Sequence, residues 1–166
     1  MKRVITLLLV ITVCISCVMF TSCGRQKITK SEAEEIVTSF FSMLSSGNYS
    51  GVAEMMHPLY YVDEDDYALL DDLSMGVYDS LLLAEAVKKD VLEEQSEAGI
   101  ELTNGVTEID FKFCTNALYD SDVDGALYGA NGTAYVGYVE FKFEIDIVLN
   151  DHGYGIAEFE FEAVND

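Results

Sequence analysis

The chain of 166 residues has no tryptophan, one proline, four cysteines and only nine lysines and arginines, against 30 aspartates and glutamates. Its formal net charge of −21 repels phosphate backbones and excludes nucleic acid as a partner. Half of the residues are hydrophobic, and this share excludes a disordered acidic chain. The length and the composition together predict one folded domain.

The N-terminal residues have the pattern of a secretory signal. A basic start precedes the largely apolar run 4–20, and small residues follow that run. The Thr-Ser pair before Cys23 resembles the lipobox of bacterial lipoproteins, in which the cysteine carries fatty acyl chains such as palmitate and becomes the first mature residue. Cys17 is the alternative acylation site. An uncleaved transmembrane anchor is the alternative to a lipoprotein, but 17 residues are short for a span.

The lipobox resemblance implies a lipid anchor on the outer side of a bacterial cell membrane. Residues 1–22 are then the signal peptide, 23–30 are a short basic tether, and 31–166 form a single domain. Two acyl chains hold a protein on a membrane stably, whereas one chain binds only marginally. Cleavage before Cys23 leaves Cys114 as the only free thiol, so the mature chain is predicted to contain no intramolecular disulfide.

The first part of the domain has the apolar period of helices. Ser31 and Glu34 have the spacing of a capping box, and the helix that they start is predicted to end at residues 45–47. Ser50 is predicted to cap a second, short helix that continues through Met56. Two more helices are predicted over 64–74 and 78–97. The apolar residues expected to mark the helix over 78–97 are Leu81, Leu82, Ala84, Ala86, Val87 and Leu92.

From residue 105 the period of the apolar residues changes to two, which is the period of strands. The pattern predicts strands within 105–119, 133–149 and 155–163, with apolar side chains at the odd positions. Helices followed by strands predict an α+β domain, whose antiparallel sheet is buried on one face and wet on the other.

The turn at 150–153 predicts the register of the last two strands, because its Gly suits a three-residue loop that pairs Asn150 with Tyr154. The same register places two like-charge pairs directly opposite each other. These pairs are Glu144 with Glu160 and Asp146 with Glu158. Each such pair destabilises a sheet mildly.

The helix over 40–49 ends in a small-Gly-polar-Tyr turn, and the short segment 53–56 and long C-terminal strands follow it. This order resembles the nuclear transport factor 2-like superfamily. The resemblance implies N-terminal helices packed on a curved antiparallel sheet, a cystatin-like cone. The superfamily includes isomerases, dehydratases and non-catalytic binders of ligands or proteins, so the resemblance does not select a function.

A cone of this kind would present aromatic and ionisable side chains to a ligand. The candidates for such a pocket are His57, Tyr60, Tyr61, Phe111, Phe113, Phe141, Phe143 and Phe159. Phenylalanines in this pattern are more often the core beneath the helices than the lining of a pocket. No serine or cysteine nucleophile stands in a recognisable catalytic pattern, so no catalytic residue is assigned.

Residues 120–125 match the D-x-D-x-D-G opening of a calcium loop, in which alternate carboxylates supply hard oxygen ligands. The twelfth position holds Asn131 in place of the bidentate Glu that would close the shell. Two alternatives therefore stand: an ordinary Asp-rich hairpin loop, and a weak calcium site. The residues of the calcium site would be Asp120, Asp122, Asp124 and Asn131, with the two like-charge pairs as a weaker second candidate.

These observations predict a membrane-anchored extracytoplasmic lipoprotein of non-enzymatic type that binds a protein partner or a small ligand. No cofactor is indicated. A weak cation-binding module that uses calcium is the first alternative, and a small isomerase-like or dehydratase-like enzyme that uses the cone pocket is the second.

Overall fold

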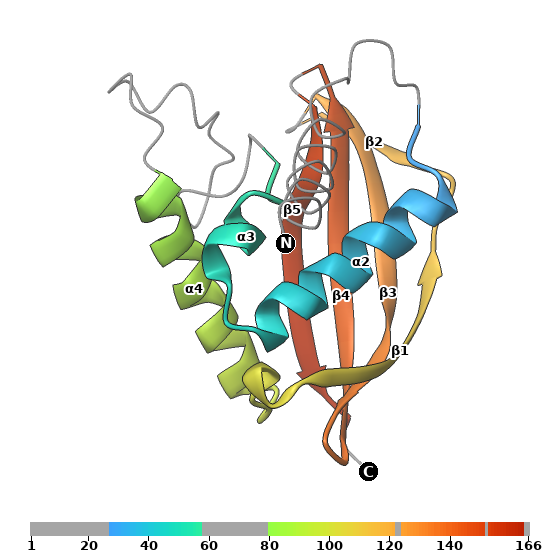
Figure 1. Cartoon of the computed structure of the whole chain (residues 1–166). Coiled ribbons are helices and arrows are strands. Elements are labelled where there is room, and N and C mark those ends of the chain that lie inside the picture. The colour runs from blue at the N-terminus through green and yellow to red at the C-terminus, as the bar shows by residue number, and fades with distance from the viewer. Residues whose placement is uncertain (1–26, 58–79, 122–123, 152, 165–166) are drawn as a thin grey trace, which may run out of the picture.

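A computed structural model describes residues 27–57, 80–121, 124–151 and 153–164. Within these ranges, three α-helices and a short 3-10 helix, η2, precede or join a five-stranded sheet (Figure 1). The helices are α2 (Lys30–Ser45), α3 (Tyr49–Ala53), α4 (Ser80–Glu97) and η2 (Leu102–Asn104). The strands are β1 (Val106–Phe113), β2 (Leu118–Asp120), β3 (Gly125–Val136), β4 (Val139–Asn150) and β5 (Gly153–Ala163).

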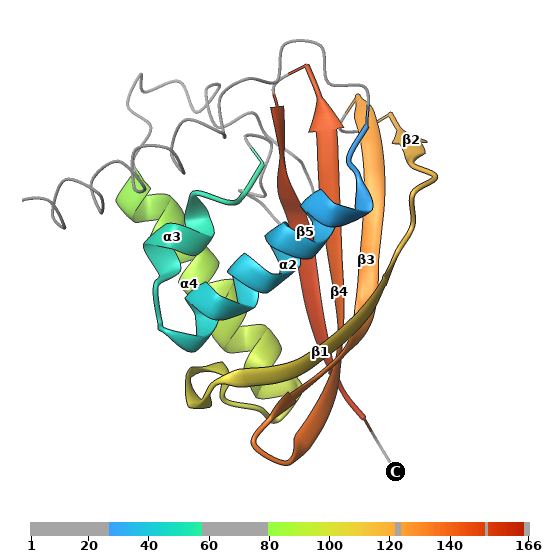
Figure 2. The same ribbon diagram turned by 45° about the vertical axis from the view of Figure 1, so that its right-hand side comes forward.

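The sheet is antiparallel throughout and has the order β1-β3-β4-β5, with β2 paired to the first part of β3. Helix α2 lies across one face of the sheet, which we call the inner face, while α4 lies on the β5 side (Figures 1 and 2). The opposite face is called the outer face. The predicted α+β class, with helices first and strands afterwards, is therefore confirmed.

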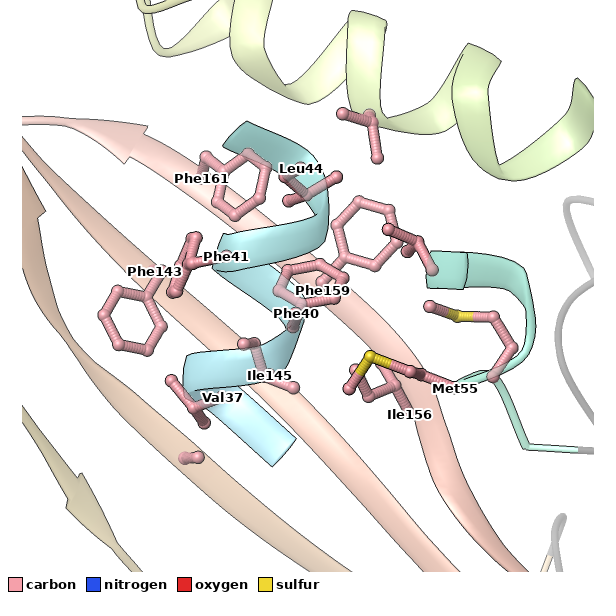
Figure 3. Packing of buried hydrophobic residues seen from close by; sticks show 14 of the residues in the cluster. Val37, Phe40, Phe41, Leu44, Met55, Phe143, Ile145, Ile156, Phe159 and Phe161 are labelled. Carbon is pink, nitrogen blue, oxygen red and sulfur yellow. The ribbon is translucent and has the colours of Figure 1, made fainter. Parts of the chain in front are cut away.

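The inner face is filled by phenylalanine rings from α2 and the sheet (Figure 3). The ring centroids of Phe41 and Phe143 are 4.9 Å apart, and those of Phe40 and Phe159 are 5.3 Å apart. Phe161 contacts both helix rings. Edge-on and tilted pairs of this kind add to the stabilisation that comes from removing apolar area from water.

The start of α2 corrects one prediction. The N-cap is Thr29, whose hydroxyl accepts a hydrogen bond from the Glu32 backbone at 3.4 Å, while the Glu32 carboxylate accepts one from the Thr29 backbone at 2.9 Å. Ser31, the predicted cap, lies inside the first turn. The reason is tertiary, because Ile28 and Ala33 flank the true cap at staple positions and both are buried in the core. Ile28, assigned to the tether by sequence, therefore belongs to the folded domain.

The next two helices also differ in detail from the prediction. Asn48, and not Ser50, caps α3 by accepting a hydrogen bond from the Gly51 backbone at 3.1 Å. This helix ends at Ala53, and Met56 instead forms an isolated parallel bridge with Ile156 of β5. The helix predicted over 64–74 lies outside the residues that the structure describes.

Helix α4 confirms the predicted helix over 78–97 for the residues that the structure describes there, Ser80–Glu97. Of its predicted apolar residues, Ala84 and Val87 are buried, whereas Ala86 and Leu92 are exposed. Leu83, Val87 and Val91 are buried at successive helical turns. Helix α4 has leucines on several sides, and its packing against α3 and β5 determines that the side with Leu83, Val87 and Val91 is buried.

Strand β3 was missed by the sequence analysis, which read 133–149 as one strand. The chain turns at Gly137, with φ of 63°, and Tyr138, so that Val136 pairs with Val139. This two-residue turn exchanges odd and even positions, and Tyr135 therefore lies on the outer face and not on the predicted inner one. The glycines of β3 conceal its strand pattern, because glycine has a low strand propensity.

The predicted register of β4 and β5 is confirmed at the two like-charge pairs. Glu144 pairs with Glu160 and Asp146 pairs with Glu158. The turn differs, however, because Asn150 pairs with Gly153 and not with Tyr154. A bulge beside Asp146 restores the expected register by inserting one extra residue in β5.

The capping geometry predicts that Thr29→Ala lowers the free energy of unfolding by about 1 kcal/mol, because the first turn loses a side-chain acceptor. Ser31→Ala, two residues later, is the matched control and changes stability by less than about 0.5 kcal/mol. Urea unfolding of the two variants compares them directly. Equal losses in both would contradict the assignment of Thr29 as the cap.

A second prediction concerns two glycines of β3. A Cβ at Gly132 would overlap the carbonyl oxygen of Asp110 and lie 2.6 Å from the Phe111 Cα, whereas a Cβ at Gly129 meets only the Asp146 carboxylate, at 3.6 Å. Gly132→Ala should therefore cost about 3 kcal/mol by forcing β1 away from β3. Gly129→Ala should stay within about 1 kcal/mol of the parent. Chemical denaturation measures both, and a tolerated Gly132→Ala would show that the close approach is not required.

Candidate functional site

A cluster of carboxylates lies on the outer face of β4 and β5. Glu144, Glu158 and Glu160 are exposed, and Asp146 is half-buried between them. Burial, followed by the charges of Glu144 and Glu158, raises the pKa of Asp146 to about 6. The pKa of Glu158 is also raised, again first by burial and then by its acidic neighbours. The outer face thus holds one carboxyl group that titrates close to neutral pH.

Basic side chains border this cluster on one side. The Lys142 ammonium lies 3.9 Å from the Glu162 carboxylate across β4 and β5. Lys112 of β1 is in the same cross-strand row as Asn131 and Glu144. Both lysines are exposed, so each adds a positive charge to a face that is otherwise acidic.

These side chains surround an open hollow of about 420 Å³ on the outer face. Its lining residues are Asp110, Phe111, Lys112, Asn131, Gly132, Thr133, Lys142, Phe143, Glu144, Glu160 and Glu162. A second hollow of about 380 Å³ shares Lys112, Asn131 and Glu144 with the first and continues past Cys114 and Asp146. Ammonium groups, carboxylates and an amide within one hollow can bind a polar ligand that carries donors and acceptors.

Of the predicted calcium residues that the structure describes, Asp120 and Asp124 lie at the end of the β2–β3 pair, whereas Asn131 lies away from them. Asp120 pairs with Gly125 where β2 meets β3, and the Asp124 carboxylate accepts a hydrogen bond of 2.5 Å from the Tyr119 hydroxyl. Asn131 lies six residues along β3 from Gly125, roughly 20 Å away at the rise of a strand. Asp122 lies outside the described residues. Among those that are described, no three acidic, histidine or cysteine side chains are grouped closely enough to hold a metal ion.

The hydrogen bond within this loop has an electrostatic consequence. It raises the pKa of Tyr119, to which the charge of Asp124 also contributes. Asp124 itself has a positive φ of 44°, a value that aspartate tolerates in turns. The loop therefore has the features of an Asp-rich hairpin.

The described pocket candidates belong to the core or pack against it, although Phe111 and Phe143 also border the first hollow and Phe113 borders the second. Phe141, Phe143 and Phe159 are buried under α2, and Phe111 and Phe113 are half-buried at the β1 side. His57 is fully buried, and its Nε2 lies 3.1 Å from the Asn150 Oδ1. Tyr60 and Tyr61 lie outside the described residues.

The cysteines fall into two groups. Cys17 and Cys23 lie outside the described residues, whereas Cys114 is exposed and its thiol donates to the Asn116 carbonyl at 3.3 Å. Within the ranges that the structure describes, no helix is both long enough and apolar enough to cross a membrane.

Sequence reasoning missed the hollow, although it placed most of its members. Lys112, Lys142 and Glu144 were assigned to the polar side of their strands, but no partner strand was known for β1. Strand β3, which was not predicted, supplies Asn131 and Thr133 to the lining of the hollow. The alternating polar residues indicate which side chains lie on the outer face. They do not indicate the order of the strands, which determines which of these side chains are neighbours.

Comparisons with protein-family models, with curated proteins and with solved structures found no match for this chain.

The raised pKa of Asp146 predicts a specific pH dependence. The folded state holds this proton at pH values at which the unfolded chain, with its ordinary pKa of 3.8, has released it, so stability rises as pH falls from 7 through 6. Asp146→Asn should remove much of this rise. It should also stabilise the protein at pH 7, by about 1 kcal/mol once its partial exposure is allowed for.

Thermal unfolding at pH 5 and pH 7 measures both effects. Glu85→Gln removes an exposed acid on α4 and is the matched control, which should leave the difference between the two pH values unchanged. An Asp146→Asn protein that is less stable than the parent at pH 7 would show that the carboxylate is instead stabilised by its surroundings.

Proposed function

We propose that this chain is a lipid-anchored extracytoplasmic protein of non-enzymatic type, which binds a protein partner or a small polar ligand at the outer face of its sheet. The observation that carries the proposal is the mixed-charge hollow whose lining includes Lys112, Asn131 and Glu144. Inner-face phenylalanines and α2 fill the other side of the sheet, so a ligand meets the outer face first.

The anchor is supported by the order of the N-terminal residues. A basic start, the apolar run 4–20 and a small pair before Cys23 are what lipoprotein processing requires. Because Ile28 is already in the core, only four residues separate Cys23 from the folded domain. The domain would therefore work within about 15–20 Å of the membrane surface.

The nature of the ligand follows from the side chains of the hollow. Lys112 and Lys142 attract anionic groups, while Glu144 and Glu160 attract cationic ones, and Asn131 offers both a donor and an acceptor. A peptide segment or a small zwitterion has these groups at this spacing. An apolar ligand would find few exposed apolar side chains here.

The cystatin-like cone remains part of the proposal. Its support is the long helix α2 across one face of an antiparallel sheet, together with the curved path of β1 around that helix (Figure 2). In this arrangement the chain uses the outer face for binding and the inner face for stability.

The anchor is tested by labelling cells that express the full chain with a radioactive fatty acid. Cys23→Ala should abolish incorporation, and Cys17→Ala, the matched control, should retain it. Label that persists in Cys23→Ala and disappears in Cys17→Ala would move the anchor to Cys17. Label in neither parent nor variants would reject lipidation.

The binding surface is tested separately with a photoreactive benzophenone amino acid at Asn131, in the full chain at the cell surface. Illumination should give a defined adduct, seen as a band shift for a protein partner or as a mass increase for a small ligand. The same amino acid at Glu85, on the exposed side of α4, is the control. An absence of adduct at Asn131, or equal adducts at both positions, would reject the hollow as the binding surface.

A further inference from the structure

The two edges of the sheet differ in how far other parts of the chain cover their backbone groups. At the β5 edge, the Met55 carbonyl accepts a hydrogen bond from Ile156 at 2.9 Å, and the Ile156 carbonyl accepts one from His57 at 2.8 Å. Farther along, the Glu94 carboxylate accepts a hydrogen bond of 2.8 Å from the Phe161 backbone. Backbone and side-chain groups thus cover the β5 edge, as proteins commonly do to prevent unwanted pairing.

At the start of the β1 edge, the Val106 backbone donates a hydrogen bond of 3.0 Å to the Ser45 hydroxyl of α2, but over residues 109–113 no described element provides such cover. β1 is the last strand on its side of the sheet, and no described element lies beyond it (Figure 1). The Cys114 backbone donates to Gly129 of β3, and the alternation of an antiparallel ladder then directs the N–H and C=O groups of Phe111 and Phe113 away from β3. These groups are ready to bond to another strand.

The side chains of the β1 edge are also incompletely covered. Ile109, Phe111 and Phe113 point to the inner face, yet all three are only half-buried, whereas the inner-face phenylalanines of β4 and β5 are buried. A strand added beside β1 would cover these three side chains. The added strand would also continue the sheet.

The charges of β1 select the partner and its register. Asp110 and Lys112 lie on the outer face, one position on either side of Phe111. Two copies of β1 that pair antiparallel about Phe111 place Asp110 of each opposite Lys112 of the other. Moving the centre of the pairing from Phe111 to Asp110 or to Lys112 would place two aspartates or two lysines opposite each other, and directly opposed like charges are unfavourable.

We propose that a second copy of this chain pairs with β1, antiparallel and centred on Phe111, so that the two sheets form one continuous sheet. Phe111 of each copy then exchanges two backbone hydrogen bonds with its symmetry mate. Asp110 and Lys112 form two equivalent ion pairs at non-hydrogen-bonded positions, where side chains approach most closely. The bulge between Thr107 and Asp110 limits the paired segment to about five residues of each chain.

This pairing bears on the outer face as well. Asp110 and Lys112 line the 420 Å³ hollow, so the hollows of the two copies become neighbours across the new strand pair. The net charge of −21 on each chain opposes association, and salt screens this repulsion. Measurements therefore belong at about 0.15 M salt, where the Debye length is roughly 8 Å.

The test is sedimentation velocity of the full chain in detergent, with the micelle contribution matched by solvent density. The parent should be a dimer. Asp110→Lys and Lys112→Asp each oppose like charges twice and should weaken dimerisation at least about tenfold. The double variant Asp110→Lys/Lys112→Asp restores both pairs in exchanged positions and should restore the dimer.

Glu85→Lys and Lys89→Asp make the same charge changes on exposed positions of α4 and should leave the dimer intact. Circular dichroism confirms that each variant is folded. A monomeric parent would overturn the proposal. Single variants that remain fully dimeric would also overturn it, and this result is expected if the chains associate through the apolar run 4–20. A folded double variant that stays monomeric would overturn it as well.

Discussion

The contact of two adjacent phenylalanines of α2 with the sheet is the interaction on which the rest of this structure depends. Phe40 meets the rings of β5, and Phe41 meets those of β4 as well as Phe161. Because the only cysteine in the described ranges is a free thiol, the fold there is held by apolar packing and the backbone ladder without a disulfide. Burying each ring contributes about 2–3 kcal/mol, so the helix and the sheet stabilise each other.

This packing decides where the protein can present chemistry. Once the phenylalanines of both layers have filled the inner face, the polar residues of β1, β3, β4 and β5 remain on the outer face. Partial burial, and after it the charges of the neighbouring carboxylates, raise the pKa of Asp146 to about 6, and two lysines offset part of the negative charge. A sheet with a packed inner face and a mixed-charge outer face is suited to binding at its surface.

The asymmetry of the two sheet edges has the same origin. The chain after α3 returns to β5 and bonds to it through Met55 and His57, and α4 contributes Glu94 to the same edge. On β1, a described helix bonds only to the first residue, where the Ser45 hydroxyl of α2 accepts from Val106, and residues 109–113 have no such partner. The connections of the helices thus leave one edge closed and most of the other available.

Local patterns of the sequence were sufficient for the helices α2 and α4, for the strands β4 and β5, and for the opposition of Glu144 to Glu160, because helical and strand periods are properties of neighbouring residues. Local patterns were insufficient where a contact between residues far apart in the chain determines the local structure. Thr29 caps α2 because Ile28 is drawn into the core, and the glycine-rich β3 becomes a strand because β1 and β4 both pair with it.

The candidate site, too, has features that local sequence patterns predict and features that depend on distant contacts. By itself, the sequence determined the acidity of the domain, the polar side of each strand and the order of helices before strands, since these follow from composition and from spacing along the chain. Only the tertiary structure decided that β3 lies between β1 and β4, and therefore that Lys112, Asn131 and Lys142 share one hollow. Strand order is set by contacts between residues far apart in the chain, and no local period records it.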